Sequence, residues 1–270
     1  CIHIPETTYG VEDAASPVRV CVIDLGTNSF HAIIVDAHPN GSYKVVDRMK
    51  EMVRLGQHGL SDQTLPEAAM DRGIRALRRI QLLAQGWNAR EFLAFATSAI
   101  REAANGGEFI HRTRQELGLM IRPISGEQEA ELIFRGVQRA VDMPDPTLLV
   151  DVGGGSVECI VVEQGESVFA TSVKLGAARM TERFISSDPL SRADREALRH
   201  HFEDLLAPVV AACREHGVVS IVGSSGTMKS LARVSLEARQ DNGSESIFQF
   251  EFETGAIQES LRWVIRSSAE

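Results

Sequence analysis

The stretch "VDVGGGSVECIVVE", residues 150–163, decides the fold. It places three successive glycines and a serine between two runs of valine-type residues, which is typical of two strands joined by a tight turn. Glycine adopts positive φ at little cost, so a structural turn of this kind needs no ligand to explain it. Taken alone, the stretch favours an ordinary hairpin over a cradle for phosphate.

The same pattern occurs earlier in the chain, in "VIDLGTNSFHAIIVD", residues 22–36. The matching pairs, all separated by 127 positions, are Asp24 and Asp151, Gly26 and Gly153, Ser29 and Ser156, Val35 and Val162, and Asp36 and Glu163. In both places a Gly-containing turn and a further strand follow. An internal repeat of this kind predicts two similar α/β halves.

Hydrophobic periodicity predicts the other elements. In the first half, strands are expected at 18–25, 30–35, 42–49, 92–97 and 119–124, and helices over 65–85, 98–105 and 126–141. In the second half, we expect strands on both sides of the glycine turn and at 167–173 and 218–223, with helices from 177, within 192–215 and over 226–234. The expected domains are a disordered tail (1–16), a first half (17–141) and a second half (142–270).

Composition limits the classes of function. The chain has 270 residues, 43% of them hydrophobic and 24% charged, which is enough for a substantial core. No run approaches the roughly 20 apolar residues of a membrane span, so we expect a cytoplasmic protein without a membrane partner. The net charge of −9 lacks the basic footprint of a nucleic-acid binder. Four cysteines without a CxxC pair argue against a zinc site or a disulfide framework.

The two glycine turns together favour a phosphate site more than either does alone. Facing each other, their backbone N–H groups and short polar side chains would hold a phosphate from both sides. The residues expected to do so are Gly26, Thr27, Asn28 and Ser29 in the first turn, and Gly153, Gly154, Gly155 and Ser156 in the second. Neither turn fits GxGxxG, so a Rossmann dinucleotide site is not indicated.

Asp24 and Asp151 end the strands beside these turns. A carboxylate next to phosphate is repelled unless a divalent cation lies between them, and magnesium is the reasonable bridge. Alternatively, each aspartate accepts hydrogen bonds from its own turn. For a single aspartate we favour that alternative; for the repeated pair we favour the metal.

Two strand-to-helix turns are further candidates. "VGSSGTMKSLA", residues 222–232, is not a Walker loop, because Met228 stands where that motif requires glycine. A helix beginning near Gly226 and Thr227 would still offer its N-terminus to an anion, although an ordinary turn explains the residues equally well. In "ATSAIREAAN", residues 96–105, Thr97 or Ser98 is expected to cap a helix. Ser98 and Arg101 are the candidate phosphate ligands there, but a solvated arginine is the commoner case.

"ISGEQEAELIF", residues 124–134, is expected to begin a helix with a capping box of Ser125 and Gln128. Glu127 and Glu129 border opposite sides of its apolar face. A carboxylate at the edge of a buried face is desolvated, which raises its pKa toward that of a useful general base. The helical wheel does not choose between the two glutamates.

In order and spacing, "VIDLGTNSFHAIIVD", "KEMVRLG", "ATSAIREAANGGEFI", "ISGEQEAELIFRGV", "LLVDVGGGSVE" and "GSSGTMKSLA" resemble the exopolyphosphatase and guanosine pentaphosphate phosphatase family. The resemblance runs from about Val18 to Ala232. It implies a duplicated fold of the actin-like (ribonuclease H-like) ATPase superfamily, with two mixed α/β sheets flanking a phosphate cleft.

The resemblance also implies a chemistry: metal-dependent release of orthophosphate from inorganic polyphosphate or from guanosine pentaphosphate, a nucleotide of the stringent response. Glu129 matches the family's catalytic glutamate, which lies just before the alanine of Gly-x-x-Glu-Ala. By the same matching, Asp151 and Glu158 would serve metal and water, and Asp24 would support the first turn. Mg²⁺ is the expected cofactor.

Two departures from the family qualify these expectations. The family's Arg-Ala-Asp segment and the long members' C-terminal domains are not found, so we expect an incomplete second half and do not infer processivity. The alternatives are a phosphotransferase or ATPase with the same fold, since paired DxG turns serve such enzymes too, and a non-catalytic polyphosphate or nucleotide sensor. No heptad or apolar stripe indicates an oligomeric state, so a homodimer stays open.

Overall fold

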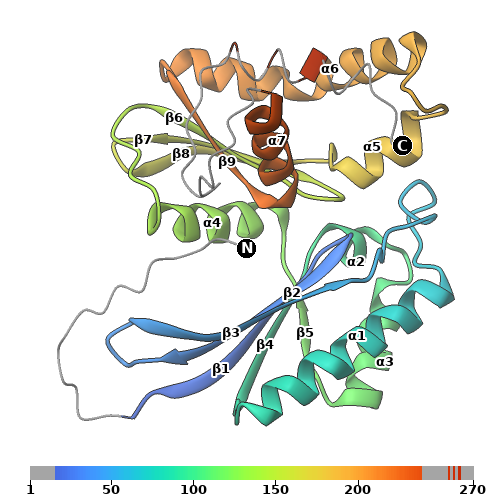
Figure 1. Cartoon of the computed structure of the whole chain (residues 1–270), viewed down its shortest axis with the longest axis vertical. Coiled ribbons are helices and arrows are strands. Elements are labelled where there is room, and N and C mark those ends of the chain that lie inside the picture. Colours follow the sequence, from blue (N-terminus) through green and yellow to red (C-terminus); the bar gives the residue numbers. More distant parts are fainter. Residues whose placement is uncertain (1–15, 239–254, 256–257, 259–260, 263–270) are drawn as a thin grey trace. The chain divides into compact units, whose positions relative to one another are not determined.

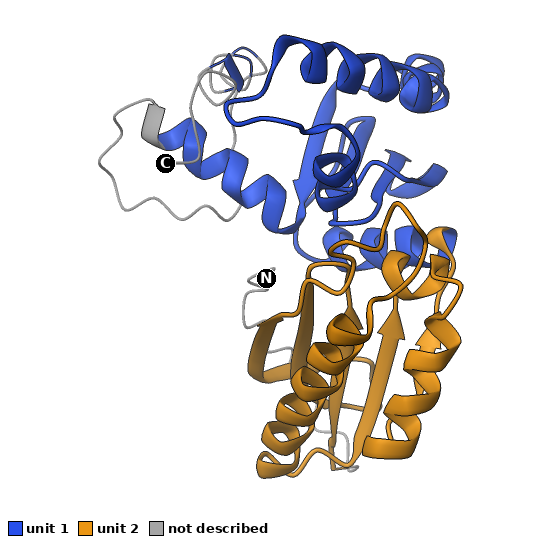
Figure 2. Cartoon of the chain, turned by 90° about the vertical axis from the view of Figure 1, so that its right-hand side faces the viewer, with its two compact units in different colours: residues 1–4, 127–270 blue, residues 5–126 orange. Residues whose placement is uncertain are grey.

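The computed structural model describes residues 16–238, 255, 258, 261 and 262, so the tail expected over 1–16 lies outside the described residues except for Ser16. The described chain forms two compact units, which divide between Gly126 and Glu127 (Figure 2). Each unit is an α/β structure with its own mixed sheet.

The first unit contains a five-stranded sheet in the order β3-β2-β1-β4-β5. The strands are β1 (Val18–Leu25), β2 (Ser29–Ala37), β3 (Tyr43–Met52), β4 (Glu91–Ala96) and β5 (Ile121–Pro123). The helices are α1 (Glu67–Gly86), α2 (Ser98–Glu102) and α3 (Gly106–Leu117). The first three strands are antiparallel neighbours, whereas β4 and β5 continue the sheet in parallel.

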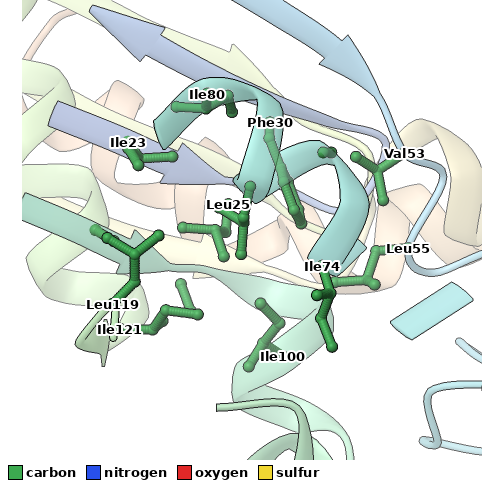
Figure 3. Close-up of a cluster of buried hydrophobic side chains, with 14 of the residues drawn as sticks. Ile23, Leu25, Phe30, Val53, Leu55, Ile74, Ile80, Ile100, Leu119 and Ile121 are labelled. Atoms are coloured by element: carbon green, nitrogen blue, oxygen red, sulfur yellow. The ribbon is translucent and has the colours of Figure 1, made fainter. Parts of the chain in front are cut away.

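Alternate residues of β1 and β2 bury one face of this sheet under α1 and α3. Figure 3 shows part of this cluster, with Ile74 and Ile80 of α1 near Leu25 and Phe30. Leu25 and Phe30, which flank the first turn, are buried in that cluster together with Ile74 and Ile80 of α1. The two strand ends that carry the turn are therefore anchored by the hydrophobic core beneath α1. Helix α3, for which the sequence pattern made no prediction, ends at Gly118 in the left-handed conformation (φ 67°) that commonly terminates helices.

The second unit contains a four-stranded sheet in the order β8-β7-β6-β9. Its strands are β6 (Thr147–Val152), β7 (Val157–Glu163), β8 (Glu166–Val173) and β9 (Ser220–Ser224). Its helices are α4 (Gly126–Gln138), α5 (Ala177–Phe184), α6 (Arg192–Glu215) and α7 (Ser225–Ala238). Helix α4 covers one face of the sheet, and α5 and α6 cover the other (Figure 1).

Helix α4 belongs to the second unit, although the sequence placed the boundary after it, at residue 142. Its apolar face consists of Ala130, Phe134 and Val137, and these side chains pack on Leu149 and Ile160 of the second sheet. The periodicity revealed that face but not its partner. The consequence for the site is that Glu129, Asp151 and Glu158 lie in the same unit.

The repeat inferred from the sequence extends to the pairing register. Leu25 pairs with Phe30 in the first hairpin, and Val152 with Val157 in the second, again at an offset of 127. The second and third strands of each sheet also slip by one residue at equivalent places, between Ile34 and Val35 and between the residues 161 and 162. Two hairpins that share a turn, a register and a bulge are the same structural unit used twice.

The two long helices lie on the surface. Helix α1 buries Ala69, Leu77 and Ile80, while α6, 24 residues long, buries only Val209 and Ala212. In the part of the chain that the structure describes, no helix combines the length and hydropathy needed to cross a bilayer.

Candidate functional site

The glycine turn of the second unit directs its carbonyl groups toward helix α5. The N–H of Gly153 donates to the carbonyl of Ser156 (3.0 Å), which closes the turn. The three donors to its glycine carbonyls are the N–H of Ala177 (2.9 Å, to Gly153), the N–H of Arg179 (3.1 Å, to Gly154) and Nε of Arg179 (2.8 Å, to Gly155). In a trans peptide, C=O and the following N–H point in opposite directions. The N–H groups of residues 154–156 therefore point away from α5, and successive N–H groups of this kind bind anions.

Glycine is required where the turn meets α5. A Cβ on Gly176 would lie 2.4 Å from backbone atoms of both Gly154 and Gly155. A Cβ on Gly153 would lie 3.0 Å from the carbonyl oxygen of Ser156. The turn and the start of α5 consequently pack backbone against backbone, which is what allows the hydrogen bonds between them to form.

The first turn is held in the same way by a different segment. The N–H of Gly26 donates to the carbonyl of Ser29 (3.2 Å). The donors to the next two carbonyls are the N–H of Gly56 (3.1 Å, to Thr27) and those of Val53 (3.0 Å) and Arg54 (2.7 Å), both to Asn28. The N–H groups of Asn28 and Ser29 thus point away from the segment 53–56 that supplies these donors. The side chain of Thr27 is buried (3% exposed), so this turn offers its backbone rather than that hydroxyl.

Polar side chains form a row across the four strands of the second sheet. In register, Asp151 on β6 lies between Glu158 on β7 and Ser224 on β9, and Ser172 on β8 pairs with Glu158. The hydroxyl of Ser172 donates to Oε1 of Glu158 at 2.7 Å, and Ser224 hydrogen-bonds Asp151. Two acidic residues therefore sit directly opposite each other beside the glycine turn.

This row faces helix α4. Side chains two residues apart on a strand share a face, so Asp151 lies on the side of Leu149, and Glu158 on the side of Ile160. Both of these hydrophobic residues pack beneath α4. The two carboxyl groups are thus on the side of the helix whose first turn carries Glu129.

Glu158 is only 1% exposed, and its environment opposes ionisation. Burial and the negative charge of Glu129 raise the pKa of Glu158 to about 7, and Asp151 adds to the effect; hydrogen bonds from Ser172 and Ser156 act against it. Burial also raises the pKa of Asp151. A buried carboxyl group whose pKa is strongly raised beside other acidic side chains is typical of a catalytic or cation-binding site.

The structure distinguishes the two glutamates that the helical wheel left equal. Glu127 is exposed, whereas Glu129 is half-buried, and its charge acts on Glu158. Glu131, farther along the helix, is paired with Arg135 at 2.6 Å on the surface. Of these three carboxylates, Glu129 is the one whose charge raises the pKa of Glu158 in the acidic row.

The raised pKa of Glu158 predicts a pH dependence of stability. The folded state keeps a proton that the unfolded state releases above its pKa of about 4.5, so the free energy of unfolding falls as pH rises from about 4.5 to about 7. The loss is at most about 3 kcal/mol. In urea unfolding with EDTA present, Glu158→Gln should lose less stability than the wild type between pH 5 and pH 8, whereas exposed Glu166→Gln should behave as the wild type. Equal losses in all three proteins would contradict the assignment.

The remaining residues expected at phosphate sites lie in the helices that follow strands β4 and β9. Ser98 is buried, and its hydroxyl donates to Oε1 of Glu102 (2.8 Å), while Arg101 donates from Nη1 to the carbonyl of Ile124 (2.9 Å). Gly226 and Thr227 are exposed in the first turn of α7. That turn follows β9, whose last residue pairs with Asp151, so α7 begins at the same sheet edge as the glycine turn.

Asp24 occupies the equivalent of Asp151 in the first unit. It is exposed at the end of β1 and lies opposite His31 on β2, where the second unit has Glu158. His31 in turn lies opposite Lys50 of β3, and its Nε2 is 2.8 Å from the hydroxyl of Ser29. The repeat thus preserves the aspartate but replaces the second carboxylate by a basic residue, so the acidic row is confined to the second unit.

A divalent cation fits this donor set only in company with a ligand. Among the described residues, no three Asp, Glu, His or Cys side chains are arranged to hold a metal ion. Asp151 and Glu158 supply two opposed carboxyl groups. Magnesium is commonly held by one or two carboxylates together with water and phosphate oxygens. The site therefore suits a cation that is bound jointly by the protein and by a phosphate chain.

Three residues of this site were not singled out from the sequence: Ser172, Ser224 and Arg179. Each acts through a residue that was, because the serines hydrogen-bond Glu158 and Asp151 and the arginine holds the glycine turn. The available signal was the pairing of "SVFATSV" with "VECIVVE", which identifies the neighbours of Glu158 once the register is known.

Comparison with known proteins points to one family. A family model described as the Ppx/GppA phosphatase family matches residues 33–261. Among solved structures, an exopolyphosphatase from Cytophaga hutchinsonii is similar at 30% identity and a TM-score of 0.85, over 93% of this chain and 80% of that chain. A Ppx/GppA family member from Aquifex aeolicus is similar at 25% identity and a TM-score of 0.72, again over 93% and 80% of the two chains. These matches confirm the expected family and its actin-like pair of mixed α/β sheets.

Proposed function

Because the chain belongs to the Ppx/GppA phosphatase family and is thus a hydrolase of phosphoanhydrides, we propose that it cleaves the terminal phosphate from inorganic polyphosphate or guanosine pentaphosphate. The products are orthophosphate and a chain or nucleotide shorter by one phosphate. Polyphosphate is the substrate to test first, since the similar Cytophaga protein is an exopolyphosphatase.

The observation that carries this proposal is the arrangement at one edge of the second sheet. The outward N–H groups of the 153–156 turn lie beside the row of Asp151 and Glu158. N–H groups arranged in this way bind phosphate oxygens. The carboxyl groups of the row provide proton acceptors and cation ligands. An anion-binding turn without acidic residues would support binding only, whereas the combination supports hydrolysis.

In the mechanism that we propose, Glu129 orients a water molecule and accepts its proton as the water oxygen attacks the terminal phosphorus. The new O–P bond forms while the bond to the bridging oxygen breaks, and that oxygen remains on the shortened chain. The N–H groups of residues 154–156 bind oxygens of the terminal phosphate and hold the phosphate in place for this attack. The first turn, built in the same way, also binds phosphate.

Asp151 and Glu158 are the residues that we propose as ligands of a magnesium ion. Bound there, such an ion would neutralise phosphate charge and allow both carboxyl groups to ionise. Asp24 would have a supporting role at the first turn.

A substrate panel tests the proposal. With magnesium present, kcat/KM for orthophosphate release from polyphosphate or guanosine pentaphosphate should exceed that from ATP by at least about tenfold. The expected preference requires the equivalent of one additional charge-assisted hydrogen bond in the transition state. Comparable turnover of ATP, or transfer that requires an acceptor alcohol, would indicate an actin-like ATPase or phosphotransferase instead. Tight binding of polyphosphate without phosphate release would indicate a sensor.

A further inference from the structure

We propose that Arg179 is a positioning residue for phosphate, holding the Gly155–Ser156 peptide so that its N–H faces the ligand; this inference rests on the function proposed above. Arg179 is 9% exposed and is the only cation among the buried residues that the structure describes. Its Nε donates to the carbonyl of Gly155 at 2.8 Å, and its backbone N–H donates to Gly154 at 3.1 Å. One residue thus fixes two consecutive peptides of the turn.

The side-chain bond restrains the peptide that most needs a restraint. Ala177 and the backbone of Arg179 hold the carbonyls of Gly153 and Gly154, and both donors are fixed in helix α5. The carbonyl of Gly155 is held by the guanidinium. Glycine permits φ and ψ values closed to other residues, so without this bond the 155–156 peptide would be free to rotate and turn its N–H from the ligand.

The guanidinium also contributes charge. A hydrogen bond from an ionised donor is roughly twice as strong as a neutral one, and it polarises the peptide that accepts it. Polarisation through Gly155 makes the N–H of Ser156 a better donor to a phosphate oxygen. The positive charge also offsets the repulsion that a phosphate meets from Asp151 and Glu158 in this unit.

The first turn lacks this device, which makes the comparison informative. The carbonyl of Asn28, equivalent to that of Gly155, accepts the backbone N–H groups of Val53 (3.0 Å) and Arg54 (2.7 Å). Those donors are neutral. The charged donor is therefore found at the turn that adjoins the acidic row, where phosphate affinity would otherwise be lowest.

The experiment measures binding and catalysis separately. Imidodiphosphate, a diphosphate analogue whose bridging NH resists hydrolysis, is titrated calorimetrically into the wild type, Arg179→Gln and Arg179→Lys with magnesium present. Arg183→Gln is the matched control, because Arg183 lies one turn farther along α5, exposed, against the ring of Phe184. Thermal unfolding of each protein defines its folded fraction.

Arg179→Gln should bind imidodiphosphate at least about tenfold more weakly than the wild type, the effect of one charge-assisted hydrogen bond. Its KM for polyphosphate should rise by a similar factor, while kcat changes by less than about threefold; a merely structural defect would lower kcat with the folded fraction and leave KM unchanged. Arg179→Lys, which keeps the charge without the planar donor, should fall between, and Arg183→Gln should match the wild type.

Wild-type affinity in a folded Arg179→Gln or Arg179→Lys protein would overturn the proposal. If Arg179→Gln does not fold, Arg179→Lys alone decides, and it must bind at least about threefold more weakly than the wild type. Because imidodiphosphate is not hydrolysed, the result does not depend on turnover. A wild type that binds it but releases no phosphate from any substrate would refute the proposed function and leave the role of Arg179 in binding to be judged by the titrations.

Discussion

Glu129→Gln is expected to lower kcat for phosphate release by about 10³-fold while changing the affinity for imidodiphosphate by less than about threefold. Glutamine preserves the size of the side chain and its hydrogen-bonding capacity but does not accept the proton of the attacking water. The charge of Glu129 acts on Glu158 within the acidic row, and this row lies at the end of the sheet that bears the glycine turn of residues 153–156. Steady-state kinetics and calorimetry measure the two quantities.

Two other glutamates of α4 provide controls. Glu131→Gln removes an exposed partner of Arg135 and should leave kcat within about twofold, since surface ion pairs contribute little. Glu127→Gln tests the alternative that the helical wheel left open and should also retain activity. If Glu127→Gln abolishes turnover and Glu129→Gln does not, the general base has been assigned to the wrong glutamate.

Removing divalent cations with EDTA is expected to reduce phosphate release to less than about 1% of the value with magnesium, because the opposed Asp151 and Glu158 would then repel the phosphate chain. Added magnesium should restore it. Asp151→Asn should raise the magnesium concentration for half-maximal activity at least about tenfold. Loss of a residue that only hydrogen-bonds a metal ligand already lowers metal affinity or activity by about 10–100-fold. The measurement is a magnesium titration of the initial rate.

Asp145→Asn is the matched control for that titration. Asp145 is exposed shortly before β6, and its carbonyl accepts the hydroxyl of Thr147 (2.7 Å), a contact that the substitution preserves. Its magnesium dependence should equal that of the wild type. Full activity in EDTA, or an unchanged magnesium requirement in Asp151→Asn, would show that the two carboxyl groups of the row do not bind a catalytic cation.

Much of the fold was predictable because the same hairpin pattern occurs twice in the sequence. The offset between Asp24 and Asp151 predicted the duplicated hairpins, and the structure reproduces it in the strand register. The partner of α4 was not predictable, because an amphipathic helix next to a boundary fits a sheet on either side of it. The apolar face of α4 predicts that this side of the helix is buried, but it does not identify the sheet that buries it.

For the candidate site, the sequence pattern led only to residues that neighbour one another in the chain. Glu158 was proposed only by resemblance, and its partner Ser172 was not proposed at all. Counting back from the Gln164–Gly165 turn, where Glu163 pairs with Glu166, an uninterrupted hairpin would place Thr171 opposite Glu158. The bulge between Val161 and Val162 shifts the pairing by one residue and brings Ser172 there instead. A bulge depends on packing between strands, and no local pattern announces it.

In both turns, backbone carbonyl groups accept hydrogen bonds from donors of the same unit. These bonds restrain the turn when no ligand is bound. A peptide flip at Gly154 or Gly155 would exchange an N–H for a carbonyl oxygen and turn the surface from anion-attracting to anion-repelling. Each flip would break a hydrogen bond to α5 that is 3.1 Å or 2.8 Å long. If the turn binds phosphate as proposed, its backbone already has the conformation that receives the ligand, and binding requires no change in it.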